Sequence, residues 1–211
     1  MSPLRAASLL IVALGLSACG GVHPGAAAVV DGRVISMETL DRTADVYCLV
    51  TARSAQQGAQ QVDNAQVRRQ AANDLVMHQV ARKVVEERGI TVDPTLTELP
   101  ASQVESIRAA FGDDADEVVT VFRRSQRLYA ELIAIGADET GRTPNQDILD
   151  PLAQAGQQAV LDAYPTYDVT FASRLGLSDD GQPDGGVGSL SVPGPGDEKA
   201  TPPSGPVGCS A

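Results

Sequence analysis

The sequence predicts an α+β fold that is mostly helical, with short β-strands at the start and the end of the folded region. β-Branched residues flank the Asp-Gly pair at 31–32, which is a strong short-range signal for a β-hairpin. Apolar residues then recur at helical spacing through much of residues 37–163, and residues 167–171 alternate as a strand does. The chain has no Trp and only three Phe, so we expect one modest domain with a core of Val, Leu, Ile and Ala.

The first elements have clear boundaries in the sequence. After the hairpin over 27–35, Ser36 has the character of an N-cap and Glu38 falls in the first turn, which predicts a helix over 37–55. A second, longer helix follows a break, with an N-cap at Asp63 and a terminating glycine at Gly89. Its apolar residues cover a wide arc, so we expect a central helix packed on more than one side.

The later elements are predicted from caps and breaks. Ser102 and Glu105 have the spacing of a capping box for a short helix through Phe111. A longer helix is expected over 115–135, ending at Gly136.

A polar connector over 137–146 leads to a last helix over 147–163 and to the closing strand. Glycine, proline, serine and aspartate dominate from Ser178 onward, which predicts an unstructured tail.

The first residues have the order of a signal peptide. A single charged residue, Arg5, precedes an apolar stretch that is too short to span a bilayer, and Leu16-Ser17-Ala18-Cys19 follows. This tetrapeptide is similar to the bacterial lipobox, which predicts cleavage between Ala18 and Cys19 and lipidation of Cys19. The protein is therefore expected on the cell membrane, lipid-anchored at its extracytoplasmic face. The alternative is an ordinary signal peptide with an incidental cysteine.

The charge of the chain limits the partners that it could bind, and its cysteines allow one disulfide. A net charge of −11 argues against binding to nucleic acid and places membrane association on the acyl chains. Once Cys19 is lipidated, Cys48 and Cys209 remain, and an oxidising compartment favours a disulfide between them. The alternative is two separate thiols.

The predicted organisation is a signal peptide (1–18), a tether (19–26), a folded domain (27–177) and a tail (178–211).

Several segments together resemble one family of chaperones. Residues 28–36 are similar to the "A-x-V-N-G-x-x-I-T" opening of SurA/PrsA/trigger-factor-type chaperones, and residues 75–92 are similar to their "L-I-x-x-x-L-x-x-x-A-x-x-x-G-I-x-V" helix. Residues 168–176 and 188–192 resemble their closing strand and tail. The resemblance implies a SurA N-terminal-like helical domain closed by the terminal strands.

The chain also departs from the family pattern. Asp31 stands where the hairpin usually has Asn, and Ala172-Ser173 stands where Asn-Pro usually precedes Arg174. Relatives with prolyl isomerase activity insert a parvulin domain of roughly a hundred residues, whereas only the connector over 137–146 and one helix occupy that gap here. The resemblance implies the chaperone module without its isomerase.

No constellation of catalytic residues is visible in the sequence. The two histidines are His23, in the tether, and His78, which has only Asp74 nearby at i−4 on the long helix. A zinc or nucleophilic site needs more converging groups, and no phosphate-binding glycine loop is present. We therefore predict no catalytic residue, no metal, no cofactor and no small-molecule substrate.

One basic cluster stands out on the helix over 115–135. It consists of Arg123, Arg124 and Arg127, and it could contact lipid head groups or an acidic client. The alternative is surface charge that is partly paired with Glu131, four residues after Arg127.

Together these features predict a lipoprotein that is not an enzyme and that binds unfolded or exported polypeptides as a holdase. An envelope adaptor with one dedicated partner is the alternative. Residual peptidyl-prolyl isomerase activity is a weaker one.

Overall fold

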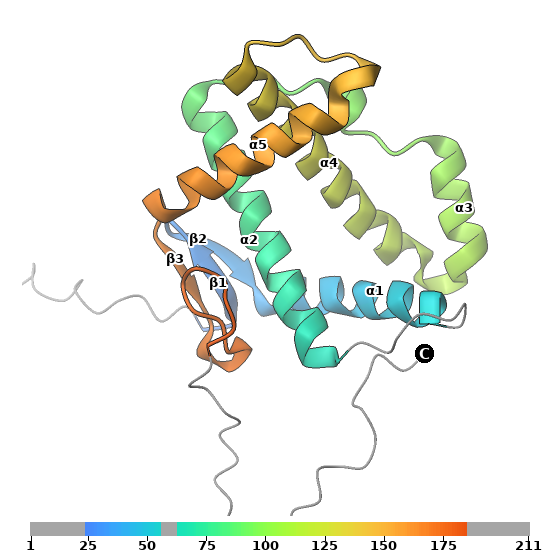
Figure 1. The fold of residues 1–211 in the computed structure, drawn as a ribbon. Helices are drawn as coiled ribbons and strands as arrows, with labels where there is room; N and C mark the ends of the chain where they lie inside the picture. The colour runs from blue at the N-terminus through green and yellow to red at the C-terminus, as the bar shows by residue number, and fades with distance from the viewer. Residues whose placement is uncertain (1–23, 56–62, 185–211) are drawn as a thin grey trace, which may run out of the picture.

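The computed structural model describes residues 24–55 and 63–184, and these residues form a mostly helical α+β fold, as predicted. Helix α2 runs through the centre of the molecule, with the small sheet beside one part of it and the other helices around it (Figure 1). Short 3-10 turns connect several of the elements. In chain order the strands and helices are β1 (Ala26–Val30), β2 (Arg33–Ser36), α1 (Met37–Ala55), α2 (Asn64–Arg88), α3 (Ala101–Phe111), α4 (Ala115–Thr140), α5 (Leu149–Ala163) and β3 (Val169–Phe171).

The sheet joins the two ends of the folded region. Its order is β2-β1-β3 and both pairings are antiparallel. Val29 in the middle strand is paired with Val34 on one side and with Thr170 on the other. The prediction that the terminal strands pair and close the helical part is therefore confirmed.

The hairpin turn is held by Asp31, which connects three elements. Asp31 and Gly32 both have positive φ, 46° and 77°, a conformation that Asp and Gly tolerate better than most residues. The Asp31 carboxylate accepts the backbone N–H of Asp168 at 2.8 Å and pairs with Lys83 Nζ at 2.8 Å. The turn is thereby fixed to the residue before β3 and to α2.

Substitutions at Asp31 should separate its backbone role from its charge. We expect Asp31→Ala to lower the free energy of unfolding by about 2 kcal/mol, because alanine disfavours positive φ and leaves the Asp168 N–H without its acceptor. Asp31→Asn keeps the conformation and one acceptor and loses an ion pair, so it should cost less than about 1 kcal/mol. Urea unfolding of both variants measures the difference, and equal losses would contradict the assignment.

The boundaries of α1 and α2 agree with the sequence. Ser36 Oγ accepts the N–H of Thr39 at 3.1 Å, as an N-cap does. Asp63 accepts the N–H of Ala65, and Gly89 ends α2 at φ 64°. Helix α2 is central because its buried residues cover a wide arc, and they are Val67, Ala71, Ala72, Leu75, Val76, Val80, Ala81 and Val84.

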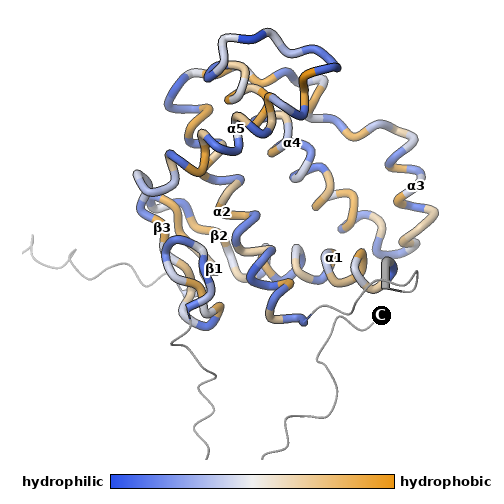
Figure 2. The backbone as a smooth tube through the Cα atoms, in the orientation of Figure 1, coloured by the Kyte–Doolittle hydropathy of each residue, from blue (hydrophilic) through white to orange (hydrophobic). Residues whose placement is uncertain are grey.

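The core has parts at both ends of the molecule. The main cluster lies between the sheet, α1, α2 and α5, and a second cluster joins α1, α3 and α4. Figure 2 shows hydrophobic residues on α3 and on the neighbouring part of α4, and hydrophilic residues along the connection between α4 and α5. The second cluster packs α4 against α1.

The predicted cap of α3 is wrong. The helix begins at Ala101, immediately after Pro100, and no side chain caps it. Ser102 therefore lies inside the first turn, where its hydroxyl cannot act as an N-cap. Pro100 stands at the N-cap position with φ −55° and ψ 140°, so the chain is still extended there and the helix begins at the next residue.

The predicted end of α4 is also wrong. The helix continues through Gly136 to Thr140 and ends at Gly141, where φ is 64°. Gly136 is buried where α4 crosses α5, and a Cβ atom there would lie 1.9 Å from the carbonyl oxygen of Leu152. Gly156 on α5 has the reciprocal contact, 1.9 Å from the carbonyl oxygen of Leu132. Gly136 therefore serves close helix packing and does not end the helix.

The ordered chain extends beyond the predicted start of the tail at Ser178. Leu177 and Pro183 form a β-bridge, Asn73 donates to the carbonyl of Gly181 at 3.0 Å, and the Tyr164 hydroxyl donates to the carbonyl of Asp179 at 2.9 Å. Residues 178–184 thus pack against α2 and the end of α5. The rest of the predicted tail lies outside the described residues.

Candidate functional site

Two adjoining cavities lie between α1, α2 and α4. Their volumes are about 200 and 320 Å³, and they share Tyr47, Asp74, Val121 and Ser125 in their lining, so we treat them as one groove, the α1–α2–α4 groove. The larger part has a mainly apolar lining, completed by Val50, Thr51, Val67, Gln70 and Phe122. The smaller part is completed by Thr43, Leu75, His78, Arg124 and Leu128.

Helical spacing places these side chains on three facing surfaces. Thr43 and Tyr47 are four residues apart on α1, and Asp74 and His78 are four apart on α2. Residues three and four apart share a helix face, so each helix presents a row of side chains to the groove. The row on α4 is Val121, Phe122, Ser125 and Leu128.

Polar groups in the narrow part of the groove are hydrogen-bonded across helices. The Tyr47 hydroxyl donates to Asp74 Oδ2 at 2.8 Å, and Arg124 Nη1 donates to Thr43 Oγ1 at 2.9 Å. The Thr43 hydroxyl in turn donates to the carbonyl of Thr39 at 2.7 Å. These bonds connect α1 to α2 and to α4 without any ion pair.

Burial disfavours charge on these groups. It raises the pKa of Asp74, whereas the hydrogen bond from Tyr47 opposes this effect. Burial, followed by the Asp74 charge, raises the pKa of Tyr47, and burial lowers the pKa of the Arg124 guanidinium. The groove therefore holds a carboxylate and a guanidinium that have both lost hydration.

The Asp74 carboxylate should cost stability at neutral pH. Because its pKa is raised on folding, the native state binds the Asp74 proton more tightly than the unfolded state does, and stability is lost as the pH rises through this range. We expect Asp74→Asn to be more stable than the natural chain near pH 7, since the amide oxygen still accepts from Tyr47. The difference in free energy of unfolding between Asp74→Asn and the natural chain should shrink as the pH falls toward about 4. Urea unfolding at several pH values measures this difference. An advantage independent of pH would contradict the assignment.

His78 lies close to Glu131 on α4. Its Nε2 lies 3.4 Å from Glu131 Oε2, without the geometry of a hydrogen bond, and both side chains are largely buried. Arg127 Nε lies 3.6 Å from the other oxygen of Glu131. Glu131 is thus a buried carboxylate held between a cation on its own helix and an imidazole on α2.

The three arginines predicted as one cluster have different surroundings. Arg123 is exposed, Arg127 is exposed and paired with Glu131, and Arg124 is half-buried in the groove. The pairing of Arg127 with Glu131 is as predicted. The role of Arg124 was missed, although its position three residues after Val121 and four before Leu128 indicates the apolar face of α4.

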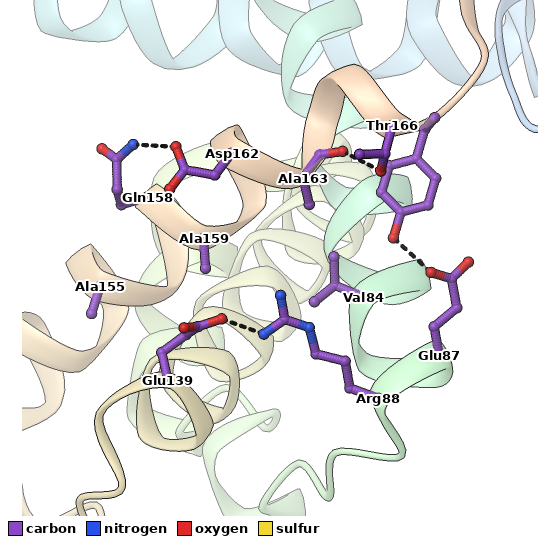
Figure 3. A pocket seen from close by; sticks show the side chains of 11 residues that line it. Val84, Glu87, Arg88, Glu139, Ala155, Gln158, Ala159, Asp162, Ala163 and Thr166 are labelled. Carbon is purple, nitrogen blue, oxygen red and sulfur yellow. Dashed lines mark hydrogen bonds and ion pairs between the residues drawn. The ribbon is translucent and has the colours of Figure 1, made fainter.

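A larger cavity, of about 600 Å³, lies elsewhere, between the ends of α2 and α4 and the length of α5. Figure 3 shows Ala155, Ala159 and Val84 facing this cavity, with charged side chains around them. Its polar groups bind one another, namely Arg88 with Glu139, Gln158 with Asp162 and Tyr167 with Glu87. The α1–α2–α4 groove is the better candidate because the guanidinium of Arg124, which lines it, has N–H donors that no described residue accepts.

Comparison with known proteins identifies the family. The family model of the SurA-like N-terminal domain matches residues 4–112, just over half of the 211 residues. The chain belongs to the SurA-like N-terminal domain family. No curated protein and no solved structure matches it.

The family match bears on what the groove could bind and on which of its helices the family shares. The SurA-like N-terminal domain is a chaperone-type module and is consistent with polypeptide clients. The matched residues contain β1, β2, α1, α2 and α3, so two of the three helices of the groove lie inside the match. Helix α4 completes the groove from outside it.

The predicted lipidation and disulfide sites are only partly described. Ala18, Cys19 and Cys209 lie outside the described residues. Cys48 is disulfide-bonded, and the Cys48–Cys209 pairing stays a prediction. Within 24–55 and 63–184, no helix is long and apolar enough to cross a membrane, and no group of three or more His, Cys, Asp or Glu side chains is placed to hold a metal ion.

Proposed function

We propose that this protein is an extracytoplasmic, membrane-anchored lipoprotein that holds unfolded or newly exported polypeptides in the α1–α2–α4 groove. The observation that carries the proposal is an open, mainly apolar groove between three helices of a chain in a chaperone-type family. A holdase needs apolar surface that unfolded segments can reach, and contiguous apolar surface commonly marks interaction sites.

The groove combines features that suit unfolded segments. Phe122, Val50 and Tyr47 are each only partly buried, so they remain available to a client side chain. The remaining guanidinium donors of Arg124 at the narrow end can bind backbone carbonyls or side chains of the same segment. Such a site binds many sequences because most of its contacts are apolar and nondirectional.

The anchor part of the proposal rests on the sequence alone. The tetrapeptide Leu16-Ser17-Ala18-Cys19 favours cleavage before Cys19 and lipidation of its thiol. Anchored in this way, the groove would face polypeptides as they emerge from the membrane. Metabolic labelling with a fatty-acid analogue, compared between the natural chain and Cys19→Ser, tests this part separately, and equal labelling of both would contradict it.

Suppression of aggregation tests the holdase part directly. The purified full chain is added at equimolar amount to a chemically unfolded client, and light scattering is followed during dilution of the denaturant. We expect less scattering than with an inert protein of similar size and charge. Equal scattering with several unrelated clients would contradict the proposal.

A further inference from the structure

The Arg124 guanidinium has fewer partners than its surroundings lead one to expect. A guanidinium has five N–H donors, and within the described residues Arg124 uses one of them, to Thr43 Oγ1 at 2.9 Å. No carboxylate among these residues lies within ion-pair distance of it. Other arginines of the described chain do form such pairs, and they are Arg33, Arg42, Arg68, Arg82, Arg88 and Arg127.

The position of Arg124 makes this shortage relevant to binding. Its side chain is half-buried and lines the smaller part of the groove, which is lined on the same side by Leu128 and Val121. Burial already disfavours its charge by lowering its pKa, so a carboxylate that enters the groove would recover interactions that the guanidinium lost on folding.

The two parts of the groove differ in size and in chemistry. The part beside Arg124, at about 200 Å³, is below the range of about 300–1,000 Å³ of pockets that enclose drug-sized ligands, and it suits one side chain better than a stretch of backbone. The adjoining part, at about 320 Å³, has Val50, Val67 and Phe122 in its lining and suits a large apolar side chain.

We propose that the α1–α2–α4 groove selects client segments in which an Asp or Glu side chain stands beside a large apolar residue, with Arg124 pairing the carboxylate. This inference rests on the proposed holdase function and specifies the class of segment that the groove prefers. The carboxylate is that of a side chain, because the smaller cavity accepts one side chain while the adjoining cavity accepts its neighbour.

Asp74 is the group that opposes this preference. It lies in the lining of both cavities, and as a carboxylate it repels a second one. Its Oδ2 already accepts the Tyr47 hydroxyl, which leaves it a weaker partner for a cationic ligand than Arg124 is for an anionic one. Removing the Asp74 charge should therefore strengthen the preference for acidic segments.

Three labelled peptides test the proposal with the full chain. Each is a fluorescein-labelled dodecapeptide of Ser and Gly with one central motif. The first peptide contains Leu-Glu-Phe and the second contains Leu-Gln-Phe, and both have an amidated carboxyl terminus. The third contains Leu-Gln-Phe and has a free carboxyl terminus. Fluorescence anisotropy measures the affinities. We expect the Glu peptide to bind about tenfold more tightly than the amidated Gln peptide, as one charge-assisted hydrogen bond provides.

Matched variants assign the preference to Arg124. Arg124→Gln should remove the tenfold difference between the Glu peptide and the amidated Gln peptide, whereas Arg124→Lys should keep part of it. Arg123→Gln makes the same change of charge on an exposed neighbour and should keep the whole difference. Asp74→Asn should widen it. Circular dichroism of each variant shows whether it is folded.

Each contrary outcome has a distinct meaning. Equal binding of the Glu and Gln peptides by the natural chain, or a preference that survives in Arg124→Gln, would overturn the inference and leave the holdase function standing. If the peptide with the free carboxyl terminus binds more tightly than the amidated Gln peptide, and the Glu peptide does not, the groove binds the carboxylate of a chain end and not that of a side chain. That result would also overturn the inference. Binding of none of the three would contradict the holdase function itself, and the inference with it.

Discussion

Replacing Gly136 by alanine is expected to lower the free energy of unfolding by about 3 kcal/mol, the upper end of the usual cost of overpacking. A Cβ atom at this position would lie 1.9 Å from the carbonyl oxygen of Leu152 and 2.8 Å from its carbon. Both are backbone atoms, which cannot rotate away as a side chain can, so α4 and α5 would have to move apart. Gly156→Ala should have the same effect, because the contact is reciprocal. Urea unfolding measures both losses.

Gly141→Ala is the matched control for this prediction. Gly141 lies at the end of the same helix with φ 64°, and nothing lies within 4 Å of the position of its Cβ. Alanine there is strained only by its backbone conformation, at a cost of about 1 kcal/mol. If Gly136→Ala cost no more than Gly141→Ala, the close crossing of α4 and α5 would be contradicted.

Filling the groove should abolish client binding while the fold stays intact. Ser125 is exposed and lies in the lining of both cavities, so Ser125→Trp places an indole in the shared part of the groove without displacing a core side chain. We expect suppression of aggregation to fall at least about tenfold, because a bulky side chain then occupies the space of a client residue. The loss of stability should stay within about 0.5 kcal/mol, as at other surface positions.

Ser106→Trp provides the comparison. Ser106 is an exposed serine on α3, and its hydroxyl donates to the carbonyl four residues earlier, as that of Ser125 does. It is absent from the lining of either cavity. An equal effect of both tryptophans, or no effect of Ser125→Trp, would mean that clients bind elsewhere.

Local signals in the sequence predicted the elements whose ends are set by local chemistry. The Asp-Gly turn at 31–32, the cap at Ser36 and the terminating glycine at Gly89 all act within a few residues of their own position. The pairing of the terminal strands was also predicted, because β1 and β3 are the strands left at the two ends of a helical region. Fold class follows from such signals without tertiary information.

Features that depend on distant contacts were missed or misassigned. Gly136 has the sequence character of a helix end, but its function is to let α5 approach, and this needs the position of Gly156 twenty residues later. The groove was missed for the same reason, because residues far apart in the sequence form it. Tyr47 and Asp74 are 27 residues apart and Thr43 and Arg124 are 81 apart, so no local pattern indicates that they meet.

The most direct test of the central claim is client capture in the native membrane. A photo-crosslinking residue at Gln70, which is exposed at the edge of the apolar part of the groove, is compared with one at Gln103, which is exposed on α3. Mass spectrometry identifies what each captures. A holdase predicts many unrelated exported polypeptides at position 70 and few at position 103. Capture of one recurrent protein would indicate an adaptor, and equal capture at both positions would contradict the assignment of the groove.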